Sequence, residues 1–287
     1  YDACQKVALQ VAQENNKTFI HPFDDAVVIE GQATLAMEML AQRTKGFDYL
    51  LVPIGGGGLV SGVITVFKEL APHTKIIGIE PEGAPSMKSA LASGKRIILD
   101  QMDGFVDGAA VRQVGKLAYE ICKTHLDQIV LVPEGKICQT ILDLYNKDGI
   151  VVEPAGAIAI AALDLFEDLF ANKSVGVLVC GGNNDIFRMP EIKERALMYS
   201  KLKHYFLIDF PQRSGALKQF VTQILGPNDD ITHFEFSKKN FRNNAPAVVG
   251  IELREATDFS LLVERMKNHN FKFDYLNDKH SLFQFLI

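Results

Sequence analysis

Four consecutive glycines follow a short apolar run in the segment Val52-Pro-Ile-Gly-Gly-Gly-Gly-Leu59. Because glycine has no Cβ, consecutive backbone N–H groups can curl around an anion there. A helix is predicted to begin just after them, near Val60, and its N-terminus would add partial positive charge. We interpret the four glycines as a phosphate cup rather than a flexible surface turn, because the strand–glycine–helix order suits anion binding.

Two better-known phosphate-binding motifs do not fit this segment. No Gly-Lys-Ser/Thr follows the glycines, which excludes a Walker loop. The last glycine of the dinucleotide-binding fingerprint is also missing. The sequence therefore predicts a phosphate cup of another class.

A second glycine motif lies far downstream, in Val177-Leu-Val-Cys-Gly-Gly-Asn-Asn184. An apolar run ends there in Cys180, and two glycines follow. In open α/β sheets, ligands bind beyond the carboxyl ends of the strands. A cysteine alone is more often a buried core residue. Its position between a strand end and two glycines favours a ligand contact, so we expect both motifs to face one ligand.

The elements that position these motifs alternate between helix and strand up to about Phe187. Predicted strands cover 18–21, 49–54, 75–80, 128–132 and 175–180. Predicted helices cover 3–15, 29–44, 61–70, 84–93, 111–124, 134–145 and 156–170. The alternation predicts an α/β fold with an open, mostly parallel sheet that is covered on both faces.

The pattern changes near Pro190. Residues 190–202 are charged and predict a linker helix. The following order is strand, helix, strand, strand, helix, strand, which predicts a ferredoxin-like α+β module. The strands are expected over 204–209, 231–237, 247–252 and 282–286, with 273–276 also possible, and the helices over 215–224 and 259–268. We predict a first domain over 1–189, a linker helix over 190–202 and a second domain over 203–287.

Composition narrows the class of protein. The 287 residues are 47% hydrophobic and 23% charged, enough for a sizeable core. A net charge of -5 argues against a nucleic-acid partner, and no apolar run approaches the roughly 20 residues that span a membrane. The four cysteines have no C-x-x-C spacing, so we predict no zinc site and a reduced, cytoplasmic enzyme. The chain starts at Tyr1, inside a predicted helix, and we expect a fragment.

Together, the two glycine motifs resemble the tryptophan synthase β type of pyridoxal-phosphate (PLP) enzymes. Other segments resemble threonine and serine dehydratases, although Ala33 stands where glycine is usual. They are His21-Pro-Phe-Asp-Asp, Ile29-Glu-Gly-Gln-Ala-Thr34, Val106-Asp-Gly-Ala-Ala-Val111 and Val152-Glu-Pro-Ala-Gly-Ala157. The resemblance covers essentially the whole chain. It implies an incomplete PLP-enzyme sheet and pyridoxal 5'-phosphate as cofactor.

The resemblance also assigns roles to residues. Cys180 would face the pyridine nitrogen, where many relatives have serine, and a neutral partner would favour β-elimination. Asn183 would support the Cys180 loop, and Glu153 would lie behind the site or merely at a helix N-terminus. Backbone amides that would hold the cofactor phosphate belong to Gly55, Gly56, Gly57, Gly58 and Leu59.

The C-terminal module resembles an ACT-like regulatory domain. Residues 206–217 resemble its first strand, loop and helix, and residues 225–236 and 249–253 resemble the single-module form of biosynthetic threonine dehydratase. Such modules pair and bind an amino acid at their interface. The implied effector is isoleucine, with valine as a possible opponent, in a homo-oligomer that is a dimer or tetramer. The alternative is a passive oligomerisation domain.

The implied reaction is PLP-dependent elimination of L-threonine to 2-oxobutanoate and ammonia, the first step of isoleucine biosynthesis. The family's lysine segment, S-F-K-x-R-G-A, and its substrate loop, S-x-G-N-H-A-Q-G, do not occur in this sequence. We therefore name no catalytic residue and expect the isolated chain to be inactive. The alternatives are a non-catalytic PLP- or amino-acid-binding fragment and a related L-serine dehydratase.

Glu80, Ala84 and Ser86 resemble, in position, a cation site of related racemases. The acidic ligand expected at Ser86 is absent. We therefore predict no metal site and a structural partner for Glu80.

Overall fold

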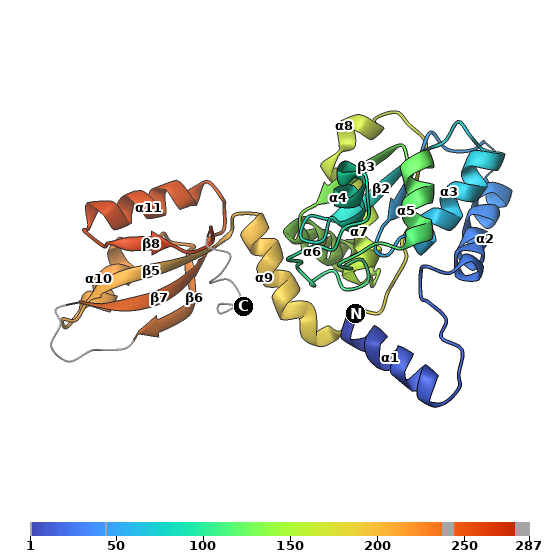
Figure 1. The fold of residues 1–287 in the computed structure, drawn as a ribbon. Helices are drawn as coiled ribbons and strands as arrows, with labels where there is room; N and C mark the ends of the chain where they lie inside the picture. Colours follow the sequence, from blue (N-terminus) through green and yellow to red (C-terminus); the bar gives the residue numbers. More distant parts are fainter. Residues whose placement is uncertain (1, 44, 237–243, 279–287) are drawn as a thin grey trace. The chain divides into compact units, whose positions relative to one another are not determined.

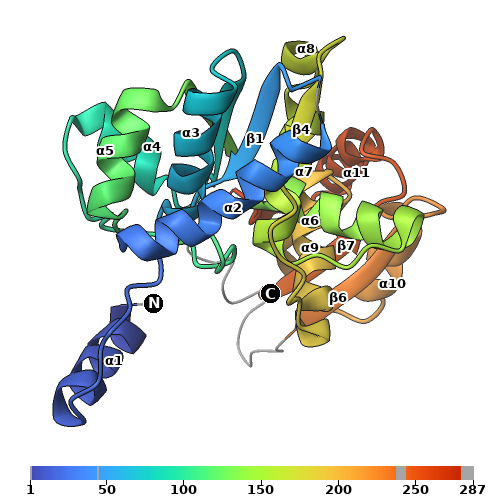
Figure 2. The same cartoon turned by 90° about the vertical axis from the view of Figure 1, so that its right-hand side faces the viewer.

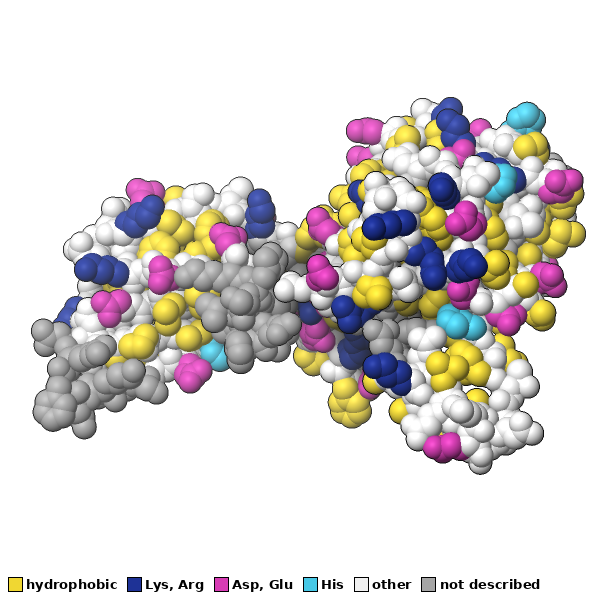
Figure 3. All heavy atoms as spheres, in the orientation of Figure 1, with side chains coloured by type: hydrophobic (Ala, Val, Ile, Leu, Met, Phe, Trp, Pro, Cys, Tyr) yellow, Lys and Arg dark blue, Asp and Glu magenta, His cyan; other side chains and the backbone are white. Residues whose placement is uncertain are grey.

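The computed structural model describes residues 2–43, 45–236 and 244–278. The chain forms two compact units, and the boundary between them along the chain lies between Ile186 and Phe187. Each unit has its own sheet (Figure 1). On the visible face of the first unit, basic and acidic side chains are interspersed (Figure 3). None of the helices in the described ranges is long and apolar enough to cross a membrane.

The first unit is built on a parallel four-stranded sheet with the order β3-β2-β1-β4. The two central strands are buried almost throughout, as expected for a sheet covered on both faces. The strands are β1 (Tyr49–Pro53), β2 (Lys75–Pro81), β3 (Gln128–Val132) and β4 (Val175–Val177). This topology confirms the predicted α/β class.

Helices cover this sheet from two sides. Figure 2 shows α3, α4 and α5 on one side and α6 and α7 on the other. Alternate residues of β1, such as Leu50 and Val52, enter the core cluster formed with α3 and α5. The helices are α1 (Asp2–Glu14), α2 (Ala26–Gln42), α3 (Gly58–Leu70), α4 (Ser86–Ser93), α5 (Lys116–His125), α6 (Glu134–Asp143), α7 (Pro154–Leu165) and α8 (Glu167–Phe170). A π-helical turn, Leu144–Asp148, extends α6.

Several predicted elements of this unit differ from the structure. Helices α2 and α3 each begin three residues earlier than predicted, and the helix predicted over 156–170 is divided into α7 and α8. Three further differences affect the residues around the glycine motifs. Residues 18–21 form no strand; instead, His21 opens a turn in which its Nδ1 accepts the N–H of Asp24 at 2.9 Å. Strand β4 ends three residues earlier than predicted, so Cys180 lies in the following loop. Helix α5 begins at Lys116 rather than at residue 111, and the residues before it are left to line a pocket.

The second unit has the β-α-β-β-α-β order of a ferredoxin-like module, which confirms that prediction. Its antiparallel sheet has the order β6-β7-β5-β8. The elements are β5 (Lys203–Pro211), α10 (Ala216–Gln223), β6 (Asp230–Phe236), β7 (Asn244–Glu252), α11 (Asp258–Asn268) and β8 (Phe273–Tyr275). Strand β8 confirms the one considered over 273–276, and the strand predicted over 282–286 lies outside the described residues.

Helix α9 (Met189–Tyr199), which follows a 3-10 turn over Ile186–Arg188, is fastened to the second unit. The buried Lys203 ammonium lies 3.5 Å from Glu194 and 3.9 Å from Glu252. The Tyr205 hydroxyl donates to the Glu194 carboxylate at 2.6 Å. The helix predicted as a linker is therefore anchored to the sheet of the second unit, whereas the predicted domain boundaries stay a prediction.

Candidate active site

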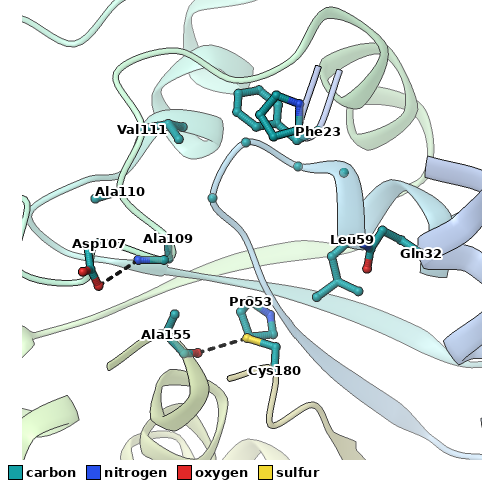
Figure 4. A pocket seen from close by; sticks show the side chains of 16 residues that line it. Phe23, Gln32, Pro53, Leu59, Asp107, Ala109, Ala110, Val111, Ala155 and Cys180 are labelled. Carbon is teal, nitrogen blue, oxygen red and sulfur yellow. Dashed lines mark hydrogen bonds between the residues drawn. The ribbon is translucent and has the colours of Figure 1, made fainter. Parts of the chain in front are cut away.

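The four glycines of the first motif and Cys180 of the second line one pocket of about 340 Å³ in the first unit (Figure 4). The glycine loop, defined as Gly55–Gly58, follows the carboxyl end of β1 and runs into α3. Cys180 follows the neighbouring strand β4. Parallel pairing of β1 and β4 puts both loops at the same edge of the sheet, which is where α/β proteins bind ligands.

Packing leaves no room for a side chain at the two central positions of this loop. A Cβ on Gly56 would overlap the Phe23 ring, and a Cβ on Gly57 would lie 2.5 Å from the Ala118 methyl. Gly57 also has a φ of 96°, in the left-handed region that favours glycine. It is the N-cap of α3, so the first backbone amides of that helix point toward the pocket end. This is a cradle for an anionic group.

Cys180 lies on the wall across from the glycine loop (Figure 4). Its Sγ donates to the Ala155 carbonyl oxygen at 3.4 Å. The residue as a whole is exposed, yet burial of its sulfur, followed by the negative charge of Glu153, raises the pKa of the thiol. The thiol is therefore neutral at pH 7 and can serve as an uncharged hydrogen-bonding partner.

Glu153 combines the two roles that the sequence left open. It is the N-cap residue of α7, and its carboxylate also packs against Gly181, where an added Cβ would overlap it. One carboxylate oxygen accepts the backbone N–H of Asn183 at 3.2 Å. Glu153 thus holds the loop that carries Cys180, and Asn183 takes part through its main chain.

Several lining residues were not predicted from the sequence. They come from three segments that were quoted only as matches to a family: the turn before α2, helix α2 itself, and the loop before α5. These residues are Phe23, Gln32, Asp107, Ala109, Ala110 and Val111. Gly108 gave an indication, because glycine next to acidic and small residues is common where backbone approaches a ligand.

Glu80 lies away from this pocket and is fully buried. Its two carboxylate oxygens accept the backbone N–H groups of Met87 and Lys88 at 2.7 and 2.9 Å, which confirms a structural partner. Burial raises its pKa to about 7, against the lowering effect of these two bonds. Within the described ranges, no group of three or more His, Cys, Asp or Glu side chains could hold a metal ion.

The second unit has its own pocket, of about 480 Å³, around the loop between β5 and α10. Phe210, Phe234 and Phe236 give it an apolar wall. Arg213 and Lys218 supply positive charge at its rim, and α10 begins there with Ala216. The pocket therefore combines an apolar surface with groups that attract a carboxylate.

Comparison with known proteins places both units. Residues 1–181 match the family described as pyridoxal-phosphate dependent enzyme, and residues 194–286 match the C-terminal regulatory domain of threonine dehydratase. Over its whole length, the chain is 51% identical to the biosynthetic L-threonine dehydratase IlvA of Halalkalibacterium halodurans and covers 69% of that protein. The chain belongs to the threonine dehydratase family. The Bacillus subtilis member is 48% identical, and 68% of it is covered.

Solved threonine deaminases share the fold. The processed form of isoform 2 from Solanum lycopersicum aligns with a TM-score of 0.64 and 37% identity, over 67% of this chain and 56% of that one. The threonine deaminase from T.th. aligns with a TM-score of 0.59 and 34% identity, over 63% of this chain and 62% of that one. The chain therefore spans less than two thirds of either of these proteins.

Membership of the threonine dehydratase family confirms the predicted fold, the predicted cofactor and the predicted class of enzyme. Pyridoxal 5'-phosphate is the cofactor, threonine is the substrate of the class, and the second unit is its regulatory domain for an amino-acid effector. The glycine loop fits the cofactor's phosphate, because its backbone lines the pocket at the N-terminus of α3. The roles of individual site residues stay predictions.

Proposed function

We propose that this chain supplies the phosphate- and ring-binding part of the active site that converts L-threonine to 2-oxobutanoate and ammonia. The observation that carries the proposal is that one pocket is lined both by the glycine loop after β1 and by Cys180, which follows the neighbouring parallel strand β4. One loop ends at a helix N-terminus, which favours an anion, and the other presents a neutral thiol.

The residues divide the work between the two ends of the cofactor. Backbone amides of the glycine loop and of Leu59 bind the phosphate and orient the ring. Cys180 would face the pyridine nitrogen. Burial, followed by the negative charge of Glu153, keeps that thiol protonated, so it would not force the ring to carry a proton. PLP, when bound, supplies the electron sink for removal of the substrate's α-proton.

A non-catalytic PLP-binding module is the second candidate for the isolated chain. No lysine lines the pocket among the described residues, and the family's lysine segment is not in the sequence. Removal of the α-proton in this class depends on a lysine that forms a Schiff base with the cofactor. We therefore expect this polypeptide to bind the cofactor without converting threonine.

Equilibrium dialysis with pyridoxine 5'-phosphate and with pyridoxine tests the cup, because neither compound has an aldehyde that reacts with surface lysines. We expect the phosphate ester to bind at least tenfold more tightly. Gly57→Ala should remove most of that preference. Gly46→Ala is the matched control, because Gly46 also has a positive φ but nothing within 4 Å of an added Cβ. Equal binding of the two compounds by the unmodified chain would overturn the proposal.

We further propose that the pocket of the second unit binds isoleucine. Its three phenylalanines suit a branched apolar side chain, and the Arg213 guanidinium with the start of α10 suits the α-carboxylate. Phe234→Ala should weaken isoleucine binding in a calorimetric titration by about tenfold, in line with loss of a buried aromatic contact. Leu261→Ala, on an exposed face of α11, is the control. Unchanged binding in Phe234→Ala would contradict this site.

Assembly and location complete the proposal. We propose that the chain forms a homodimer or homotetramer, since regulatory modules of this kind pair, and sedimentation velocity would reveal a monomer if this is wrong. We also propose a cytoplasmic location. Its support is that all four cysteines are unbridged, as is usual in a reducing compartment.

A further inference from the structure

The turn over His21–Asp25 packs directly on the glycine loop, on the side marked by Phe23 in Figure 4. The Phe23 ring occupies the space that a Cβ on Gly56 would need. The Phe23 backbone lies 3.1 Å from where a Cβ on Gly58 would be. One aromatic residue therefore covers two of the four glycines.

Asp24, the residue after Phe23, is hydrogen-bonded to the start of α5, a helix that lies far along the chain. Its carboxylate accepts the backbone N–H groups of Lys116 and Leu117 at 2.8 and 2.9 Å, in the first turn of α5. The preceding residue, Gly115, donates its own N–H to the Gly56 carbonyl oxygen at 2.9 Å. Asp24, the start of α5 and the glycine loop are thus joined by one closed set of contacts.

Two details show how closely this set is packed. A Cβ on Gly115 would lie 2.8 Å from Asp24 Oδ1, so the approach of Asp24 to α5 needs glycine there. The His21 ring accepts the Asp24 N–H at 2.9 Å and packs edge-on against the Phe23 ring, with centroids 4.6 Å apart. The turn is therefore held both by its own hydrogen bonds and by those to α5.

Four successive glycines lose more conformational entropy than any other residues when they adopt one shape. If the loop became ordered only when a phosphate bound, this entropy loss would weaken binding. A loop that the protein has already ordered therefore binds phosphate with higher affinity. We propose that Phe23 and Asp24 form a clamp that holds the glycine loop in its phosphate-binding shape. Asp24 is then a positioning residue for the cofactor's phosphate, and this inference rests on the proposed role of the glycine loop.

Electrostatics alone makes the opposite prediction. Asp24 carries a negative charge on a segment that packs against the glycine loop, so removal of that charge would strengthen binding of an anion. Under the clamp, the same change weakens binding, because the carboxylate loses hydrogen bonds to α5. Asp24→Asn keeps the shape of the side chain and one acceptor oxygen, so it separates the two effects.

The test compares the affinities for pyridoxine 5'-phosphate and pyridoxine by equilibrium dialysis on the full chain. The dissociation constant of pyridoxine divided by that of pyridoxine 5'-phosphate measures how much the phosphate group contributes to binding. We expect Asp24→Ala to reduce the ratio about tenfold, or about 1.4 kcal/mol, and Asp24→Asn to reduce it about threefold. Asp127→Asn is the matched control, because Asp127 also accepts a backbone N–H, that of Ile76 at 2.8 Å, but at the amino end of β2.

Each result decides a separate point. A ratio near one in the unmodified chain overturns the phosphate cup itself. A large ratio that both Asp24 variants retain, or that Asp24→Asn increases, overturns the clamp and leaves the cup standing. If Asp24→Ala does not fold, Phe23→Leu replaces it, with circular dichroism as the check on folding and the same fall in the ratio expected.

Discussion

Replacing Glu80 by glutamine tests how one buried carboxylate makes stability depend on pH. Glu80 is fully buried between β2 and α4, and burial raises its pKa to about 7. In the unfolded chain the same group ionises near its ordinary value of 4.5. Glutamine has the shape of the protonated acid but cannot ionise.

The sign follows from proton linkage. Between the two pKa values, the folded state binds more protons than the unfolded state, so stability falls as pH rises. The contribution of Glu80 to the free energy of unfolding is therefore fully present below about pH 4.5, and it is lost as the pH rises to about 7. A difference of two to three pKa units corresponds to about 3 kcal/mol, at 1.36 kcal/mol per unit. Glu80→Gln should lose this dependence. It also carries a cost that does not vary with pH, because the amide nitrogen cannot accept the backbone N–H that one Glu80 oxygen accepts.

Urea unfolding of the full chain at pH 5, 6, 7 and 8 measures the effect as a difference between two proteins. The free energy of unfolding of the unmodified chain should fall relative to that of Glu80→Gln by about 3 kcal/mol over this range. Glu120→Gln, a change at an exposed residue of α5, should run parallel to the unmodified chain. Parallel curves for Glu80→Gln as well would refute the reasoning, because Glu80 would then ionise with its ordinary pKa.

Three further changes test other parts of the molecule. Alkylation of Cys180 by iodoacetamide should be slow at pH 7, because the pKa of its thiol is raised. Glu153→Gln should increase the rate of alkylation, and an unaltered rate would contradict the effect of the Glu153 charge. Gly181→Ala should lower the free energy of unfolding, measured with urea, by about 1–3 kcal/mol, because the added Cβ would overlap the Glu153 carboxylate. An unchanged free energy would mean that the loop can move to accept the Cβ. Glu194→Gln should lower the free energy of unfolding, measured by thermal unfolding, by about 2 kcal/mol, and no change would mean that the Lys203–Glu194 ion pair contributes nothing. The loss is smaller than for a fully buried pair, because this pair is partly exposed and Lys203 keeps Glu252 as a second acidic neighbour.

Much of the fold was predictable because its determinants are local. Short apolar runs between helical patterns predict buried parallel strands, and three of the four strands in the first sheet match to within one residue. The same reasoning predicted the β-α-β-β-α-β order of the second unit. It was wrong over residues 18–21, because a strand needs a partner and the His21 side chain instead closes a turn with Asp24.

The end of β4 illustrates the limit of apolar patterns. Residues 178–180 are as apolar as the strand before them, so the sequence predicts that pairing continues. Among the described residues, β4 lies at the edge of the sheet and pairs with β1 alone, and its strand ends at Val177. The chain then turns away, which puts Cys180 on the pocket wall instead of in a strand.

By itself, the sequence determined the glycine loop, the thiol after a strand and the regulatory module, because each is a contiguous run with its own hydrogen-bonding or packing pattern. Tertiary structure alone decided what surrounds them. Phe23 meets Gly56, Asp24 meets the start of α5, and Glu153 meets Gly181 across long stretches of chain. Such contacts depend on the order of the strands and on how the helices cross them, and no local pattern encodes which side chains these arrangements bring together.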